Sequence, residues 1–214
     1  NTGSWNVVTG TITADTSVSP DGQTTGDTFD QTSTGGYLYI GPAISASTTY
    51  TASIFLKAGT KTTARLWFTT GGFGTYVLID VNLSAGTIGT VQSAGGATAA
   101  AASIQAFGNG WYRVSLTGNL SSTTTGYVVV GNDSGTGTVL VWGAQLEAGS
   151  FATSYIPTLA SSVTRSADVA SVNTLSPWFN ESALSLYTEF DIASATSTSM
   201  ISASIDSGSA NGYM

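Results

Sequence analysis

The chain of 214 residues contains no cysteine and no histidine. Without cysteine, a disulfide framework and thiol chemistry are excluded. Without histidine, there is no Ser-His-Asp triad, no zinc–histidine site and no imidazole base that titrates near neutral pH. These two absences remove the commonest ways in which a small domain is cross-linked, binds zinc or performs nucleophilic catalysis.

Charge is also scarce. Charged residues make up 8% of the chain, against roughly 25% in an average soluble protein. Only five residues are basic and the net charge is −7, so we expect no nucleic-acid partner, because little is available to neutralise phosphates. No apolar run approaches the roughly 18 residues of a membrane span, and no signal peptide opens the chain, which begins "NTGSWN" like a piece of a longer polypeptide. We therefore expect no membrane insertion.

The chain is rich in threonine, serine, glycine and alanine, and 41% of its residues are hydrophobic. Many β-branched and turn residues with few helix formers predict an all-β domain. Turn signals such as "SPDGQ", "TGGFG" and "NDSGTGT" separate strand-like runs. Their spacing predicts an antiparallel two-sheet jelly-roll sandwich, with residues 94–103 as a loop. The runs are residues 5–15, 36–42, 48–58, 63–70, 75–83, 103–108, 110–120, 125–133 and 138–147.

The strand pattern stops near Gly149 and returns after residue 174. We expect three parts: a jelly roll over residues 1–148, an extended linker packed on it over residues 149–173, and a further β segment over residues 174–214. Phe151, Tyr155 and Ile156 are the expected apolar anchors of the linker. Because an isolated strand pair is marginal in water, the last part is either the start of an incomplete second β-sandwich or an arm that packs on a neighbouring subunit.

Several stretches occur together in a characteristic order: "SPDGQTTGDTF", "TTYTASIFLKAG", "LSAGTIGTV", "FGNGWYRVSLT" and "VWGAQLEAGSFATSYIPT" followed by "SSVTRSADVASV". Together they resemble a jelly-roll module, similar to carbohydrate-binding modules, of bacteriophage tail-fibre, head-fibre and related virion appendage proteins. The resemblance covers about residues 5–172. The later stretch "WFNESALSLYTEFDI" resembles the first strands of concanavalin-A/laminin-G-like sandwiches.

This resemblance implies a virion structural protein, a fibre or spike module at the virion surface that displays a β-sandwich for assembly or for contact with host-surface glycans. It also implies a homo-oligomer, trimeric as fibres of this class usually are, with other virion proteins as partners and a polysaccharide as ligand. The alternative is a carbohydrate-binding module of a secreted bacterial enzyme or adhesin. Oligomeric state and the role of residues 174–214 separate the two.

Sandwich domains that bind sugars use aromatic faces and a few polar side chains. Trp67 in "ARLWFTTGGFGTY" stands before a glycine-rich turn, and Arg65 shares its strand face. Tyr37 and Tyr39 share one face of "GYLYI" and would form a platform. The alternative for Trp67 and for the tyrosine pair is burial in the core, where we also expect Trp111 and Trp142. The candidate glycan-binding residues are Arg65, Trp67, Phe73, Tyr76, Tyr37 and Tyr39.

Four acids, Asp15, Asp21, Asp27 and Asp30, lie in a stretch without a strong strand pattern. The resemblance to carbohydrate-binding jelly rolls implies a structural calcium ion near the first strands. No EF-hand spacing is present, however, and turn chemistry alone explains Asp21 in "PDG". We expect no cofactor and no metal, with a structural calcium as the alternative.

Glu189 and Asp191 in "TEFDIAS" stand two residues apart on one strand face. Concanavalin-A-like glycosidases use a Glu-x-Asp-x-x-Glu strand, and the position of the last acid is occupied here by Ser194. Retaining hydrolysis needs two carboxylates about 5 Å apart. We therefore expect no enzymatic activity from this chain.

Overall fold

The computed structural model describes residues 5–121, 124–158 and 163–164. These residues form thirteen β-strands and no helix, and the chain divides into two compact units after Pro157. The strands are β1 (Asn6–Val8), β2 (Thr11–Val18), β3 (Thr24–Gln31), β4 (Tyr37–Ile40), β5 (Tyr50–Ala58), β6 (Thr63–Thr69), β7 (Tyr76–Asn82), β8 (Thr87–Ile88), β9 (Gln92–Ala94), β10 (Thr98–Ala106), β11 (Trp111–Asn119), β12 (Tyr127–Gly131) and β13 (Gly137–Ala148).

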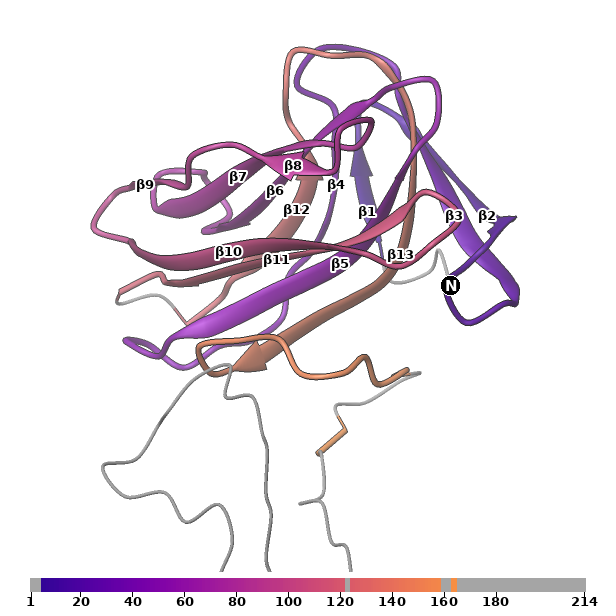
Figure 1. Cartoon of the computed structure of the whole chain (residues 1–214). Coiled ribbons are helices and arrows are strands. Elements are labelled where there is room, and N and C mark those ends of the chain that lie inside the picture. Colours follow the sequence, from indigo (N-terminus) through magenta and orange to yellow (C-terminus); the bar gives the residue numbers. More distant parts are fainter. Residues whose placement is uncertain (1–4, 122–123, 159–162, 165–214) are drawn as a thin grey trace, which may run out of the picture. The chain divides into compact units, whose positions relative to one another are not determined.

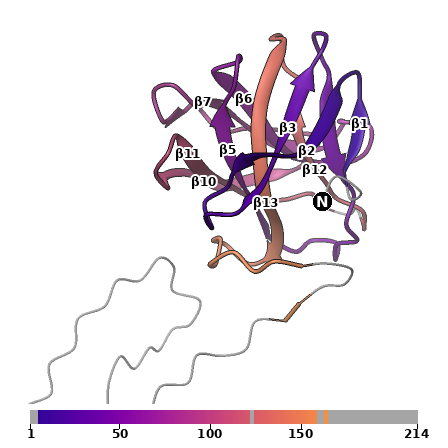
Figure 2. The same cartoon turned by 90° about the vertical axis from the view of Figure 1, so that its right-hand side faces the viewer.

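The strands form two antiparallel sheets, which lie face to face (Figures 1 and 2). The seven-stranded sheet has the order β1-β4-β12-β6-β7-β8, and β9 pairs with another part of β7. The six-stranded sheet has the order β10-β11-β5-β13-β3-β2. Most neighbours within a sheet are distant in sequence, as jelly-roll connections require. The predicted all-β, two-sheet jelly-roll sandwich is confirmed, while residues 174–214 lie outside the described residues.

The core lies between the sheets and follows strand alternation. In β5, Ala52, Ile54 and Leu56 are fully buried and face the core, as the period-two pattern of "YTASIFLKA" predicts. Leu66 and Phe68 of β6 meet them from the other sheet's inner face. Every second residue of these strands thus packs in the core, and the residues between them point away from it.

The residues after β13 cover the outer face of β5. The Thr51 hydroxyl donates to the Gly149 carbonyl at 3.0 Å, and the Thr153 amide donates to Glu147 Oε1 at 2.7 Å. The Ile156 amide donates to Gln145 Oε1 at 2.9 Å. This part of the predicted linker therefore folds back on the six-stranded sheet and belongs to the first compact unit.

Two expectations about individual aromatic residues were wrong. Trp142 does not enter the core: it lies on the outer face of β13, where its ring packs against Phe55 at 5.1 Å and Tyr155 at 4.6 Å between centroids. Phe151 does not anchor the linker, since 40% of its surface is exposed. Trp111, in contrast, is buried and donates from Nε1 to the Val18 carbonyl at 2.9 Å.

Three strands, β3, β8 and β9, and the first part of β10 are absent from the predicted runs. β3 carries polar residues even at buried positions, so no apolar alternation marks it. Asp27 and Gln31, for example, are 4% and 1% exposed. The expected loop over residues 94–103 contains the last residue of β9 and most of β10, which pairs with β11 at the sheet edge. Small side chains in "TAAAASIQA" gave no hydrophobic signal, and pairing with β11 formed the strand nonetheless.

A buried polar cluster holds the turn between β12 and β13. The Lys61 ammonium, 6% exposed, is ion-paired with the Asp133 carboxylate and donates to Gln31 Oε1 at 2.9 Å. Gln31 Nε2 in turn donates to the carbonyls of Asp133 at 3.1 Å and Gly135 at 2.6 Å. Because each buried polar group has a partner, the cluster fixes this turn without an unsatisfied charge.

Candidate functional site

The outer face of the seven-stranded sheet carries an unusual row of side chains. Register places Tyr39 of β4 opposite Val129 of β12, Val129 opposite Trp67 of β6, and Trp67 opposite Leu78 of β7. Residues paired in register point to the same side of a sheet. Their neighbours in sequence, such as Leu38, face the core, so this row points away from it.

Six aromatic rings on this side form one connected series, which we call the aromatic face. Adjacent centroids are 5.3 Å apart for Tyr127–Tyr39, 5.9 Å for Tyr39–Tyr37 and 5.3 Å for Tyr37–Phe73. The series continues from Phe73 to Trp67 at 5.3 Å and from Trp67 to Tyr76 at 4.9 Å. All these contacts are tilted or edge-to-face, the geometries that aromatic pairs prefer. The members of the aromatic face are Tyr37, Tyr39, Trp67, Phe73, Tyr76 and Tyr127.

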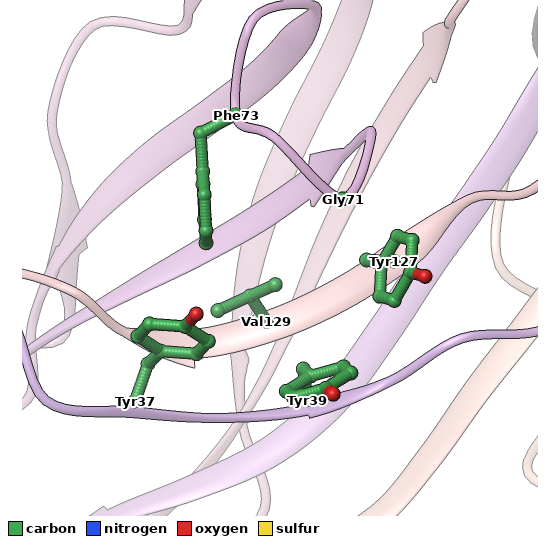
Figure 3. A pocket seen from close by; sticks show the side chains of 6 residues that line it. All are labelled: Tyr37, Tyr39, Gly71, Phe73, Tyr127 and Val129. Carbon is green, nitrogen blue, oxygen red and sulfur yellow. The ribbon is translucent and has the colours of Figure 1, made fainter. Parts of the chain in front are cut away.

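A pocket of about 110 Å³ opens within this face. In Figure 3, Tyr37 and Tyr39 line one side from β4, Val129 forms the floor, and Phe73 reaches in from the turn after β6. The tyrosines and Phe73 are half-buried, so each ring keeps an exposed surface. The pocket therefore combines aromatic ring surfaces with the phenolic hydroxyls of its three tyrosines. It is lined by Tyr37, Tyr39, Gly71, Phe73, Tyr127 and Val129.

Trp67 lies beneath the other rings of the aromatic face. It is 7% exposed, and its Nε1 donates to the Gly131 carbonyl at 3.2 Å. Phe73 and Tyr76 pack their rings against it. Trp67 is thus buried, as the core alternative held, but on the outer side of the sheet. It positions the rings that line the pocket and does not line the pocket itself.

Phe73 occupies a strained backbone conformation. Its φ is +55°, in the left-handed region that bulky side chains rarely adopt. The Phe73 amide donates to the Thr70 carbonyl at 3.0 Å, and the Thr70 amide donates to the Thr75 carbonyl at 2.9 Å, which closes the turn. Strain of this kind persists where surrounding structure holds it in place and is concentrated at functional sites. Here it directs a phenyl ring onto Trp67 and Tyr37.

Tyr127 is a site residue that the sequence analysis missed. Its ring lies between two glycines: a Cβ atom at Gly41 would come within 2.9 Å of one ring edge, and one at Gly71 within 3.0 Å of the other. Both glycines are therefore required for the close approach of the backbone to this ring. The available signal was alternation in "GYVVVG", which places Tyr127 on the side opposite the core residue Val128.

Arg65 lies beside the aromatic face, although it does not line the pocket. Its guanidinium carbon is 5.5 Å from the Trp67 ring centroid. Its Nε and Nη2 donate to the two carboxylate oxygens of Asp80 at 2.6 and 3.1 Å. The hydrogen bonds to Asp80 raise the pKa of Arg65 above its ordinary value. Arg65 is thus one half of a bidentate ion pair.

The structure joins all six predicted candidates on one face, but it separates their roles. Tyr37, Tyr39 and Phe73 line the pocket, and Trp67 and Tyr76 lie beneath or beside those rings. Arg65 is ion-paired with Asp80. Glycan binding by any of them stays a prediction.

The four N-terminal acids are dispersed. Asp21 accepts the Ser19 hydroxyl at 2.6 Å and the Gln23 amide at 3.0 Å; the Ser19 hydrogen bond is the main cause that lowers the pKa of Asp21. Asp27 instead accepts the Asp15 amide at 3.1 Å within the β2–β3 pair. Within residues 5–121, 124–158 and 163–164, no three acidic side chains gather as a metal site would require.

Glu189, Asp191 and Ser194, the basis for expecting no catalysis, lie outside the described residues. So do residues 159–162 and 165–173 of the predicted linker. In the described part of the chain, no helix has the length and apolar character of a membrane span.

No protein-family model matches this chain, and none of the curated proteins matches it. Several solved structures show a distant likeness, and two of them are described here. One is the enzymatically active domain of tailspike protein 4 of bacteriophage CBA120, with a TM-score of 0.40 and 11% identity over 69% of this chain and 20% of the tailspike chain. The other is the CBM22-1 xylan-binding domain of Paenibacillus barcinonensis Xyn10C, with a TM-score of 0.42 and 12% identity over 69% of this chain and 87% of that domain. This chain thus spans only a fifth of the tailspike chain.

Proposed function

We propose that this chain is a glycan-binding β-sandwich module of a phage virion appendage, and that the aromatic face is its binding surface. The observation that supports binding best is the assembly of six aromatic side chains from four strands and one turn on a single outer face. The appendage setting is supported by the sequence resemblance. The module acts by binding, without catalysis.

The chemistry of the pocket suits a sugar ring. The apolar C–H faces of a pyranose pack on aromatic faces, while its hydroxyls exchange hydrogen bonds with groups at the rim. Tyr37, Tyr39 and Tyr127 each offer both a ring and a hydroxyl, and Phe73 offers a ring alone. A phenol both donates and accepts, so the rim accommodates hydroxyl groups in several orientations.

The charge of the pocket favours a neutral sugar. None of its six lining residues is charged, and the nearby Arg65 guanidinium is bound by Asp80. An acidic sugar buried here would lose hydration of its carboxylate without gaining a cation as partner. We therefore propose a neutral polysaccharide of a host surface as the ligand.

The proposal extends to the setting of the module. We propose that it lies at the virion surface in a homotrimeric fibre, with other virion proteins as neighbours, as the resemblance implies. The alternative setting is a secreted bacterial enzyme or adhesin that carries the same module. Light scattering on residues 1–214 and on residues 1–173 separates them. A trimer that becomes a monomer on truncation supports the appendage, and a monomer in both cases supports the alternative.

Binding itself is tested on a glycan array that holds neutral and acidic oligosaccharides, with wild-type protein and two variants. Tyr39→Ala removes a ring from the pocket, whereas Phe107→Ala removes an exposed ring on the other side of the sandwich and serves as the control. We expect signals for neutral glycans that Tyr39→Ala abolishes and Phe107→Ala retains. Signals that survive Tyr39→Ala, or that appear for acidic glycans alone, would contradict the proposal.

A further inference from the structure

A second hollow lies on the same side of the seven-stranded sheet, beyond Arg65. Its volume is about 420 Å³, and most of its lining residues carry polar side chains, whereas the lining residues of the aromatic pocket are mainly aromatic. The β6–β7–β8 register places Thr63 opposite Asn82 and Asn82 opposite Thr87, so these three residues point to one side. The lining residues that carry polar side chains are Thr63, Arg65, Asp80, Asn82, Thr87, Asp133 and Ser134.

The two hollows lie at opposite ends of β6. Arg65 borders the polar hollow, and Thr69 is opposite Tyr127 of the aromatic pocket. Arg65 and Thr69 are four positions apart along the strand, which corresponds to about 13 Å. Several linked sugar units, but not a single one, would reach across this distance. Trp67 lies between the two ends, with the Arg65 guanidinium beside its ring.

The polar hollow contains charges that are already neutralised. Asp80 is paired with Arg65, and Asp133 is paired with Lys61. Each carboxylate oxygen accepts more than one hydrogen bond, so the Asp80 side chain, 47% exposed, still has acceptor capacity for hydroxyl groups. An ionic ligand would gain little electrostatic attraction from two ion pairs whose charges already cancel, whereas a neutral polyhydroxylated ligand would gain hydrogen bonds.

Asn82 supplies a positioned donor. Its Oδ1 accepts from the Ser84 amide at 3.1 Å, the Ser84 hydroxyl at 2.8 Å and the Ala85 amide at 3.0 Å. These three bonds fix the side chain and leave its NH₂ group as the part to offer a ligand. The exposed hydroxyls of Thr63 and Thr87 flank it in register.

We propose that the polar hollow is a second subsite and that the ligand is an extended neutral oligosaccharide that occupies both hollows at once. The inference rests on the proposed function, because it assumes that the same face binds a glycan and then specifies the length and polarity of that glycan. It adds a site, formed by Thr63, Asn82 and Thr87, whose contribution depends on the length of the glycan.

The test is isothermal titration calorimetry with xylo-, cello- and manno-oligosaccharides of two and six units. The double variant Thr63→Val/Thr87→Val replaces two exposed hydroxyls by methyl groups of the same shape, and Asn82→Asp keeps Oδ1 but removes the NH₂ donor. Tyr127→Ala serves as the comparison in the aromatic pocket. Circular dichroism and thermal melts verify that each variant is folded.

We expect the six-unit ligand of at least one series to bind more tightly than the two-unit ligand. The polar variants should weaken six-unit binding by about tenfold, the effect of one or two lost hydrogen bonds, without changing two-unit binding. Tyr127→Ala should weaken both. Equal affinity for both lengths, or unchanged six-unit binding in the polar variants, would overturn the second subsite and leave the proposed function intact. Failure of every series to bind wild-type protein would overturn both.

Discussion

The phenol ring of Tyr155 lies against the indole of Trp142, with their centroids 4.6 Å apart. Tyr155 also approaches Phe55 at 6.2 Å, and Trp142 donates from Nε1 to the Thr25 hydroxyl at 3.0 Å. These contacts join the segment after β13 to the outer face of the six-stranded sheet. The two outer faces therefore differ: one is covered by the chain itself, and the other presents the aromatic pocket.

Removal of the Tyr155 ring should destabilise the sandwich. Tyr155→Ala loses packing against two aromatic rings, and because the side chain is only half-buried we expect about 2 kcal/mol, below the range for fully buried aromatics. Phe151→Ala is the matched control, since that exposed ring should contribute less than about 0.5 kcal/mol. Urea denaturation measures both. Equal losses for the two variants would show that the Trp142 contact does not hold the segment.

Alkaline pH should loosen the same contact. Burial, and next the charge of Asp21, raises the pKa of Tyr155 above its ordinary value of 10.0. Because the folded state holds this proton more tightly, the contribution is fully present below the ordinary pKa. It is lost as pH rises through the raised pKa. We expect wild-type protein to lose more stability than Tyr155→Phe between neutral pH and the alkaline range. Parallel curves of melting temperature against pH for the two proteins would refute this expectation.

Substitutions of Phe73 should separate the cost of backbone strain from the contribution of the ring to binding. Phe73→Gly and Phe73→Ala both remove the ring, but only glycine adopts a φ of +55° without strain. We expect the glycine variant to be about 1 kcal/mol more stable than the alanine variant, while both lose binding to the neutral glycans identified on the array. Urea denaturation measures the first effect and calorimetry the second. Retention of full affinity in either variant would remove Phe73 from the site.

Two ion pairs should differ in their effect on stability. Asp133→Asn leaves the buried Lys61 ammonium without its carboxylate, which should cost about 3 kcal/mol. Asp80→Asn breaks the pair with Arg65, but the Asp80 side chain is 47% exposed, so the loss should stay below about 1 kcal/mol. Urea denaturation at low and high salt compares the same substitution at both positions. A larger loss of stability in Asp80→Asn than in Asp133→Asn would contradict the conclusion that the Lys61–Asp133 pair is the more buried of the two.

Strand alternation made much of the site predictable. "GYLYI" places Tyr37 and Tyr39 on one face whatever the rest of the fold, and "RLW" does the same for Arg65 and Trp67. Tyr127 follows the same rule in "GYVVVG", although it was not among the predicted site residues. β3 and the first part of β10, which carry polar or very small residues, were missed, since their formation depends on pairing with other strands and leaves no apolar alternation in the sequence.

The sequence by itself determined the all-β class, the jelly-roll sandwich, the exclusion of thiol and imidazole chemistry, and which side chains share a strand face. These properties are local, or depend on composition alone. Only the tertiary structure decided which face of each strand meets the core, because that depends on which strands pair and in what register. Trp142 illustrates the limit: the sequence leaves open which face of β13 meets the core, and the fold places Val139 and Val141 there and Trp142 on the outer face against Tyr155.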